Sequence, residues 1–267
     1  MTSFHLVIPA FEESVRLPAY LDELAGDVEA LGFPVRILVV DDGSSAPERD
    51  ALARTVNDLA SRHPSILPPL LLPENQGKGG AILAGWSAGH DAKWFGFVDA
   101  DGATPSREVV RVLTLAAARV GGPDCFFASR IKLLGRRIER KMSRHLMGRV
   151  YATLVGSLIH PGVYDSQCGF KLLSARAFAA TRAVISEKRF AFDVDLLAAL
   201  IEAGMSIEEI PIDWKDIPGS KVSFVKDTVR MFVSLLRIRT KRKQRRAAAS
   251  QADRVAVAVE TCNTSVE

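Results

Sequence analysis

The chain has 267 residues, of which 48% are hydrophobic and 25% are charged, and its formal net charge is +4. These values are typical of a globular protein with a sizeable core, and no apolar run approaches the length of a membrane-spanning helix. No signal peptide is expected, and the three cysteines form neither a disulfide framework nor a metal-ligand pattern, so we expect a cytoplasmic, reducing environment.

The first half of the chain alternates between short apolar runs, which predict buried strands, and apolar residues three or four apart, which predict helices. The predicted elements are a strand at 4–8, a helix at 17–31, a strand at 35–40, a helix at 47–60, a strand at 66–72, a helix at 79–89 and a strand at 94–98. Pro68 and Pro69 shorten the strand at 66–72 or confine it to an edge. The alternation predicts an α/β fold with a mainly parallel central sheet and helices on both faces.

The second half of the chain is less regular. Its predicted elements are a strand at 125–129, a basic amphipathic helix at 138–158, a strand at 170–173, a helix at 192–203, a strand at 207–214 and a helix at 222–238. We expect a single domain over residues 1–240, with 222–246 as a basic amphipathic C-terminal segment. The Ala/Ser/Thr-rich tail at 247–267 has no core pattern and is expected to be disordered.

Two carboxylates follow the apolar run at 94–98. Because residues i and i+2 of an extended chain point to the same side, Asp99 and Asp101 can converge on one hard cation, and Gly102 allows the chain to turn. Such a site suits Mg²⁺ or Mn²⁺ that also binds substrate phosphates, which is the chemistry of a nucleotide-sugar or nucleotide transferase. The alternative for an isolated motif of this kind is a polar turn at a strand end.

Other polar turns are expected at the same sheet edge, because ligands of such sheets bind beyond the carboxyl ends of the strands. The turn at 9–13 and the acids Asp41 and Asp42 can contact a base or ribose, or can serve only as turn and capping residues. Lys78 stands in a Gly-rich turn at 75–81 that opens a helix. This turn either binds an anion or only packs closely against the sheet.

The second half contributes further candidates. In the turn at 165–171, Asp165 is a better functional candidate than Cys168, which lacks a neighbouring histidine. Asp193 is expected to cap the helix at 192–203. Residues 130–149 hold eight Lys or Arg and one acid, and residues 237–246 hold seven Lys or Arg and no acid. Such blocks attract phosphates, nucleic acid or an anionic membrane.

Taken together, these motifs resemble the family 2 inverting glycosyltransferases of GT-A fold, and within them the dolichyl- and polyprenyl-phosphate enzymes. The resemblance covers residues 4–240 and depends on the order of the motifs, since each alone is weak. The motifs are VIPAFEE at 7–13, VVDDGSS at 39–45, NQGKGGA at 75–81, VDADGAT at 98–104, ASR at 128–130, DSQCGFK at 165–171, RFAFDVDLL at 189–197 and WKDIPGSK at 214–221.

The resemblance implies a nucleotide-diphosphate sugar donor, Mg²⁺ or Mn²⁺, and a polyprenyl or dolichyl phosphate acceptor. Glucose is favoured over mannose, because Ala103 stands where mannosyl relatives carry Gln. By resemblance, Asp99 and Asp101 would hold the metal. The other implied residues are Pro9, Glu12, Asp41, Asp42, Lys78, Asp99 and Lys221 for the donor, Arg137, Arg140 and Arg144 for the acceptor phosphate, and Asp165, Gln167 and Arg130 for catalysis.

The eukaryotic members of this group begin with a membrane anchor, and no such anchor is expected at residues 1–8, which predict a strand. We therefore expect the basic helices to hold it peripherally on the inner face of the cytoplasmic membrane, or the acceptor to be soluble. The alternatives are a family 2 enzyme acting on a soluble or other lipid hydroxyl, a nucleotidyltransferase, and a basic nucleic-acid-binding module. No nucleic-acid partner is expected, because few aromatic residues interleave with the basic ones.

Overall fold

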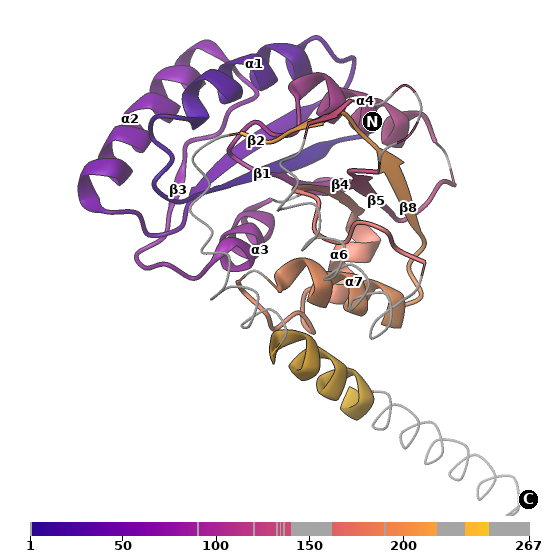
Figure 1. The fold of residues 1–267 in the computed structure, drawn as a ribbon. Coiled ribbons are helices and arrows are strands. Elements are labelled where there is room, and N and C mark those ends of the chain that lie inside the picture. The colour runs from indigo at the N-terminus through magenta and orange to yellow at the C-terminus, as the bar shows by residue number, and fades with distance from the viewer. Residues whose placement is uncertain are drawn as a thin grey trace, which may run out of the picture. The chain divides into compact units, whose positions relative to one another are not determined.

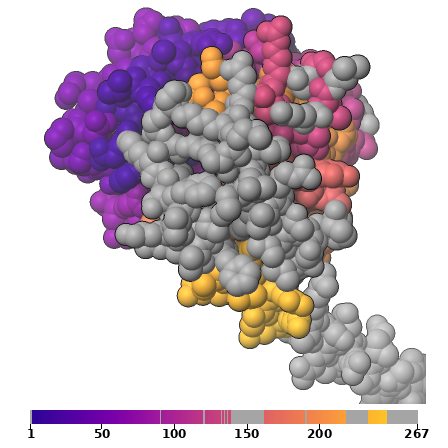
Figure 2. Space-filling model, in the orientation of Figure 1, coloured from indigo at the N-terminus to yellow at the C-terminus, as the bar shows by residue number. Residues whose placement is uncertain are grey.

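The computed structural model describes residues 2–89, 91–119, 121–131, 133, 135, 137–139, 162–189, 191–217 and 233–245. The chain divides into two compact units, residues 1–222 and 223–267. In the space-filling view, the N-terminal elements of the first unit form a continuous, closely packed surface in indigo and purple (Figure 2).

The first unit is built on a seven-stranded sheet with the strand order β3-β2-β1-β4-β7-β5-β8 (Figure 1). Strand β7 runs antiparallel to both of its neighbours, and the other pairs are parallel. The strands are β1 (Phe4–Ala10), β2 (Val35–Asp41), β3 (Leu70–Leu71), β4 (Trp94–Val98), β5 (Cys125–Ser129), β7 (Phe170–Ser174) and β8 (Ile207–Pro211). The predicted mainly parallel α/β sheet is confirmed, and the strand containing Leu70 is short and lies at an edge, as its prolines predict.

Helices cover both faces of this sheet (Figure 1). They are α1 (Leu17–Glu29), α2 (Ala46–Arg62), α3 (Lys78–Ala88), α4 (Ser106–Ala118), α6 (Ala175–Thr181) and α7 (Phe192–Glu202). Helices α1, α2 and α4 lie on one face, and α3, α6 and α7 lie on the other. The side chains of β1 alternate between these two faces. Leu6 and Ile8 pack in the core with residues of α1 and α4, whereas the ring of His5 is hydrogen-bonded to the Gly85 carbonyl of α3.

An aromatic cluster joins α3, α6 and α7 to strand β4. The Trp86 ring lies 5.5 Å from Phe178 and 6.1 Å from Phe192, and Phe97 of β4 lies 6.2 Å from both Trp86 and Phe192. The indole N–H of Trp86 donates to the Gly96 carbonyl at 2.8 Å. This packing fixes the helix that begins at Lys78 against the strand that ends just before Asp99.

The structure corrects the predicted helix at 138–158 at its start. Ile138–Glu139 is a two-residue strand, β6, which pairs in parallel with β9 (Trp214–Lys215). The reason is pairing with the segment at 213–215, since the Trp214 N–H donates to the Arg137 carbonyl and the Arg137 N–H donates to the side-chain carboxylate of Asp213. Residues 140–158 of the predicted helix lie outside the described residues.

The predicted strand at 207–214 is in fact two strands in two different sheets, β8 and β9. Strand β8 ends at Pro211, which has no N–H to donate, and the Ile212 N–H then bonds to the Ser129 carbonyl. Helices α4 and α6 were not predicted from the sequence.

In the second unit, residues 233–245 form a helix, which continues beyond the predicted end at residue 238. Much of the basic run is therefore helical. Leu235 and Ile238 are buried, whereas Val233 and Leu236 are 41% and 44% exposed. The predicted helical residues 222–232 and the predicted disordered tail lie outside the described residues. Among the residues that are described, no helix is both long and apolar enough to cross a membrane.

The close approach of α3 to the sheet requires glycine at position 85. A Cβ atom there would lie 2.7 Å from a methyl carbon of Val7 and 2.9 Å from one of Val40. We predict that Gly85→Ala lowers the free energy of unfolding by about 1–3 kcal/mol, measured by urea denaturation.

Gly26→Ala is the matched control, because this exposed helical glycine in α1 has no atom within 4 Å of the added Cβ. Alanine is favoured in a helix interior by about 0.5–1 kcal/mol, so this variant should be as stable as the parent or more stable. Equal destabilisation by both changes would contradict the packing argument.

Candidate active site

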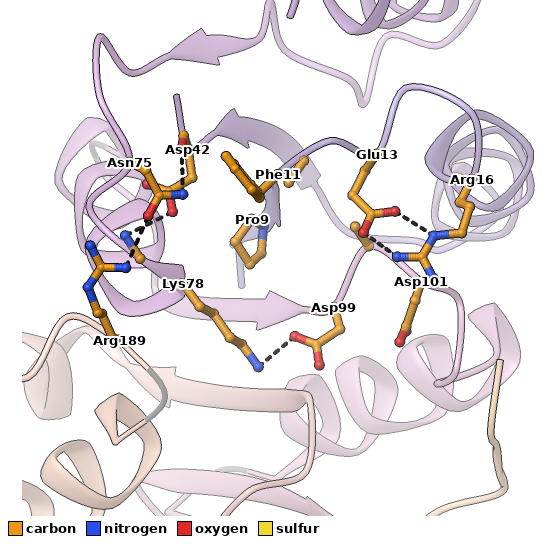
Figure 3. A pocket seen from close by; sticks show the side chains of 13 residues that line it. Pro9, Phe11, Glu13, Arg16, Asp42, Asn75, Lys78, Asp99, Asp101 and Arg189 are labelled. Carbon is orange, nitrogen blue, oxygen red and sulfur yellow. Dashed lines mark hydrogen bonds and ion pairs between the residues drawn. The ribbon is translucent and has the colours of Figure 1, made fainter. Parts of the chain in front are cut away.

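A cavity of about 390 Å³ lies where β1, β2 and β4 end and α3 begins (Figure 3). This is the edge at which the predicted polar turns were expected to meet. The lining residues are Pro9, Ala10, Phe11, Glu13, Arg16, Asp42, Asn75, Gly77, Lys78, Asp99, Ala100, Asp101 and Arg189. Of the predicted donor and metal residues, Pro9, Asp42, Lys78, Asp99 and Asp101 are therefore brought together.

Asp42 holds the loop that leads into α3. Its two carboxylate oxygens accept hydrogen bonds from the N–H groups of Gln76 and Gly77 at 2.7 and 2.8 Å. Burial raises the pKa of Asp42, and these two N–H groups act against that rise. Asp42 thus lines the cavity and organises its loop at the same time, whereas its contact with a base or ribose stays a prediction.

Asp41 and Glu12 lie beside the cavity and do not line it. The fully buried Asp41 carboxylate accepts from the hydroxyl and the N–H of Ser44, as in the capping alternative. One Glu12 oxygen accepts from the Ser45 N–H at 2.7 Å. The neighbouring Glu13 lines the cavity instead, where its carboxylate is paired with Arg16.

Lys78 and Asp99 form an ion pair in the cavity, with 2.6 Å between the Lys78 Nζ and one Asp99 oxygen (Figure 3). Partial removal from water raises the pKa of Asp99, and Lys78 opposes this effect. Burial lowers the pKa of the Lys78 ammonium, but the attraction of Asp99 and Asp193 outweighs burial, so that the net shift is upward.

The loop that carries Asp101 is fixed from two sides. Asp101 accepts from the Ala103 N–H at 3.0 Å, and the Tyr20 hydroxyl of α1 donates to the Thr104 carbonyl at 2.8 Å. Gly102 has a φ of +70°, which favours glycine at this turn. The loop therefore holds Asp101 close to the end of β4, and within the described residues only one of its carboxylate oxygens accepts a hydrogen bond.

The chemistry of Asp99 and Asp101 fits a hard divalent cation. Two carboxylates supply oxygen ligands, and a cationic ammonium already lies against one of them. No cluster of three or more potential metal-ligating side chains occurs within the described part of the chain. Oxygens of water or of a substrate phosphate would have to complete the ligand sphere, which is how Mg²⁺ and Mn²⁺ commonly bind beside nucleotides.

The cavity contains two arginines that the sequence reasoning missed. Arg16 projects from the start of α1, and Arg189 precedes α7 and donates to the Asn75 side chain at 3.3 Å. Arg189 is the first residue of the RFAFDVDLL motif, and its place in that motif was the signal in the sequence that could have identified it as a site residue. No spacing rule connects it to Asn75, since 114 residues separate the two.

A second cluster contains the predicted catalytic residues Arg130 and Asp165. The Arg130 guanidinium makes a two-pronged ion pair with Asp165, at 2.7 and 2.8 Å, and lies 5.4 Å from the centre of the Trp214 ring. The backbone N–H of Asp165 is held by Glu209 at 2.9 Å. Burial lowers the pKa of Arg130, but Asp165, with a smaller contribution from Asp99, gives a net upward shift.

The remaining predicted residues are placed as follows. Gln167 is half-buried in the same turn as Asp165, and the Arg137 side chain is exposed. Arg140, Arg144 and Lys221 lie outside the described residues. Asp193 does not cap α7, because Ala191 occupies the N-cap position and the Asp193 carboxylate pairs with the buried ammonium of Lys171 at 2.5 Å.

A mainly parallel sheet ends in two carboxylates beside a cavity lined by cationic side chains, which suits a phosphate-bearing substrate bound with a divalent cation. The model described as "Glycosyl transferase family 2" matches residues 5–181, and the chain belongs to this family of glycosyltransferases.

Curated relatives include dolichyl-phosphate beta-glucosyltransferases. The protein from Dictyostelium discoideum is 30% identical over 243 residues, which are 88% of this chain and 73% of the relative. The Homo sapiens protein is 31% identical over 244 residues, 88% of this chain and 74% of the relative.

Among solved structures, the fold matches glucosyl-3-phosphoglycerate synthase from Mycobacterium tuberculosis in complex with Mn²⁺, uridine diphosphate and phosphoglyceric acid. The TM-score is 0.65 at 15% identity, over 89% of this chain and 78% of the other. Mannosyl-3-phosphoglycerate synthase from Rubrobacter xylanophilus matches with a TM-score of 0.64 at 15% identity, over 92% and 75% of the two chains. These likenesses confirm the predicted GT-A fold.

We predict that Asp101→Ala removes Mn²⁺ binding and sugar transfer while leaving the fold intact. The Asp101 side chain supports only a local turn, whereas its carboxylate is half of the candidate metal site. Mn²⁺ binding is measured by the loss of the free-ion paramagnetic resonance signal, and folding by thermal denaturation. Asp50→Ala in α2, an exposed residue, is the control. Full turnover in excess chelator would contradict the metal assignment.

Proposed function

We propose that this enzyme transfers glucose from a nucleotide-diphosphate sugar to a polyprenyl or dolichyl phosphate, with inversion at the anomeric carbon. The observation that carries the proposal is the cavity that Lys78, Arg16 and Arg189 line together with Asp99 and Asp101. The dolichyl-phosphate beta-glucosyltransferases that match most of the chain support the choice of sugar and acceptor.

Charge development explains how these residues act. As the bond to the sugar breaks, the nucleoside diphosphate gains negative charge, which cations placed in advance stabilise. The Lys78 ammonium and the guanidinium groups of Arg16 and Arg189 line the cavity and would serve that purpose. A divalent cation held by Asp99 and Asp101 would supply further stabilisation of the leaving diphosphate.

The acceptor side requires little base catalysis if the acceptor is a phosphate. The second pKa of a phosphate monoester is about 6, so the group is largely dianionic at neutral pH and is already a nucleophile. Both carboxylate oxygens of Asp165 are engaged by Arg130. Asp165 therefore suits a positioning role, in which it holds Arg130 toward the phosphates, better than the role of a general base.

The decisive experiment is a donor screen with a short-chain polyprenyl phosphate as acceptor and glycolipid formation as the readout. We expect the highest rate with a glucose donor, and dependence on Mg²⁺ or Mn²⁺. Asp165→Asn should reduce turnover far less than Asp101→Ala, because the phosphate needs no base. If Asp165→Asn is as inactive as Asp101→Ala, or if only an alcohol accepts the sugar, the phosphate-acceptor proposal is wrong.

We propose that the helix at 233–245 holds the enzyme on an anionic membrane without spanning it. Basic residues near an anionic surface contribute about 1 kcal/mol each, less at higher salt. Its basic residues in the described range are Arg237, Arg239, Lys241, Arg242, Lys243 and Arg245. Arg237, Arg239 and Lys243 are exposed and therefore available to lipid headgroups, whereas Arg242 is buried.

We predict that truncation after Ile238, and replacement of Arg237, Arg239 and Lys243 by Gln, abolish co-sedimentation with anionic liposomes but spare folding. The triple replacement is the sharper test, since truncation interrupts a helix. The control replaces the exposed Arg36, Arg54 and Arg62 by Gln, which removes the same charge elsewhere. Unchanged binding by the truncated protein would exclude this helix as the anchor and direct attention to 130–149.

A further inference from the structure

The Lys78 ammonium stands between two carboxylates. Its Nζ is 2.6 Å from an oxygen of Asp99 and 3.9 Å from an oxygen of Asp193. The first carboxylate is a candidate metal ligand at the end of β4. The second projects from the first turn of α7 and is only 4% exposed. Lys78 therefore contacts Asp99 closely, and a small rotation of its side chain would bring its ammonium into contact with Asp193.

Asp193 is held in place by a second lysine, Lys171. The Lys171 side chain on β7 is fully buried, and its ammonium donates to Asp193 at 2.5 Å and to the Cys168 carbonyl at 2.9 Å. A buried ammonium without a counter-charge would be strongly destabilising, so this pair is fixed. The result is a row of alternating charges that runs Lys171, Asp193, Lys78, Asp99 from the core into the cavity.

The two ammonium groups share one aromatic ring. The Lys78 Nζ lies 4.9 Å and the Lys171 Nζ lies 5.3 Å from the centre of Phe97. A cation within about 6 Å of the ring centre is attracted to the aromatic face, and both ammonium groups lie inside this range. Lys78 can therefore shift between its two carboxylates while it keeps this contact, because its stem is flexible and its charge compact.

We propose that Asp193 is a positioning residue that receives the Lys78 ammonium when a divalent cation binds Asp99. Without metal, Lys78 neutralises Asp99. With metal, the Lys78 ammonium turns to Asp193. The Asp193 carboxylate then compensates the charge of Lys78, and the remaining N–H donors of Lys78 point toward the diphosphate. The inference rests on Asp99 as a metal ligand, and therefore on that part of the proposed function, but not on the identity of sugar or acceptor.

This arrangement has an energetic signature. Lys78 competes with the cation for Asp99, so its removal should tighten Mn²⁺ binding. Asp193 lowers the cost of displacing Lys78, so its removal should weaken Mn²⁺ binding, but only when Lys78 is present. Coupling of this kind between contacting groups is measured by a double-mutant cycle.

The experiment measures the Mn²⁺ affinity of the full-length protein by paramagnetic resonance, without nucleotide, sugar or acceptor. The variants are Lys78→Met, Asp193→Asn and the double variant. We expect Lys78→Met to bind Mn²⁺ about tenfold more tightly, and Asp193→Asn to bind it about tenfold more weakly. In the Lys78→Met background, Asp193→Asn should have no further effect.

Three results would overturn the proposal. The first is an equal loss of affinity from Asp193→Asn in both backgrounds, which would mean that Asp193 acts by general charge or structure. The second is unchanged affinity in Asp193→Asn. The third is a wild-type protein that binds no Mn²⁺, which would remove the metal assignment as well. If the enzyme fails to transfer glucose, the double-mutant cycle of Mn²⁺ affinities is unaffected. The proposal for Asp193 and the proposal of glucose transfer can therefore fail independently.

Two further variants guard against misfolding. Asp195→Asn is the matched control, since it removes a buried carboxylate of the same helix that bonds to Ser186 and Glu187 and not to Lys78. It should leave Mn²⁺ affinity unchanged. The double variant Lys171→Met with Asp193→Asn removes both partners of the buried pair, which avoids an unpaired charge, and should weaken Mn²⁺ binding as Asp193→Asn does.

A direct measurement uses the wild-type protein alone. Crystals grown with and without Mn²⁺ should differ in the position of the Lys78 ammonium, which contacts Asp99 without metal and Asp193 with it. A Lys78 Nζ that remains in contact with Asp99 while the metal is bound would overturn the proposal, whatever the variants show.

Discussion

The contact between Asp99 and Gly169 is the constraint on which the site depends. A Cβ atom at position 169 would lie 2.0 Å from an Asp99 carboxylate oxygen, and the Asp99 N–H donates to the Gly169 carbonyl at 2.9 Å. This backbone approach fixes the carboxyl end of β4 against the start of β7. Because β7 is antiparallel to both neighbours, the turn that precedes it, with Asp165, lies on the same sheet edge as the cavity lined by Asp99. The Arg130–Asp165 pair is thereby held beside the candidate metal site.

Every side-chain cation that lines the cavity already has an acidic or polar partner. Arg16 is paired with Glu13, Lys78 with Asp99, and Arg189 with the Asn75 amide. The cations of the cavity are therefore held in place by their partners before any substrate arrives. A diphosphate with its metal would replace these internal contacts by new ones, so that the cations exchange partners when the substrate binds.

The sequence predicted the strands that end at the cavity, because continuous apolar runs followed by acids and glycines are strong local signals. Local patterns also predicted that Asp42, Lys78 and Asp99 would meet at one sheet edge. The spacing of Val109, Val112, Leu113 and Ala116 is that of a helix face, so α4 was within reach of the same reasoning. By contrast, the pairing of Lys171 with Asp193 could not be predicted, because it depends on how β7 and α7 pack. The short strand at Ile138 is set by its partner Trp214, far along the chain, and not by any local pattern.

Phe97 gives the hydrophobic core a part in the chemistry of the cavity. Its ring belongs to the aromatic cluster around Trp86, and both Lys78 and Lys171 lie near its centre. An aliphatic residue of similar volume at this position would preserve packing but would remove the negative quadrupole that two neighbouring cations share. Volume-conserving exchange is usually well tolerated in a core. Here it would alter the electrostatic environment of a lysine that lines the cavity, so one phenyl ring serves both the packing of the core and the candidate site.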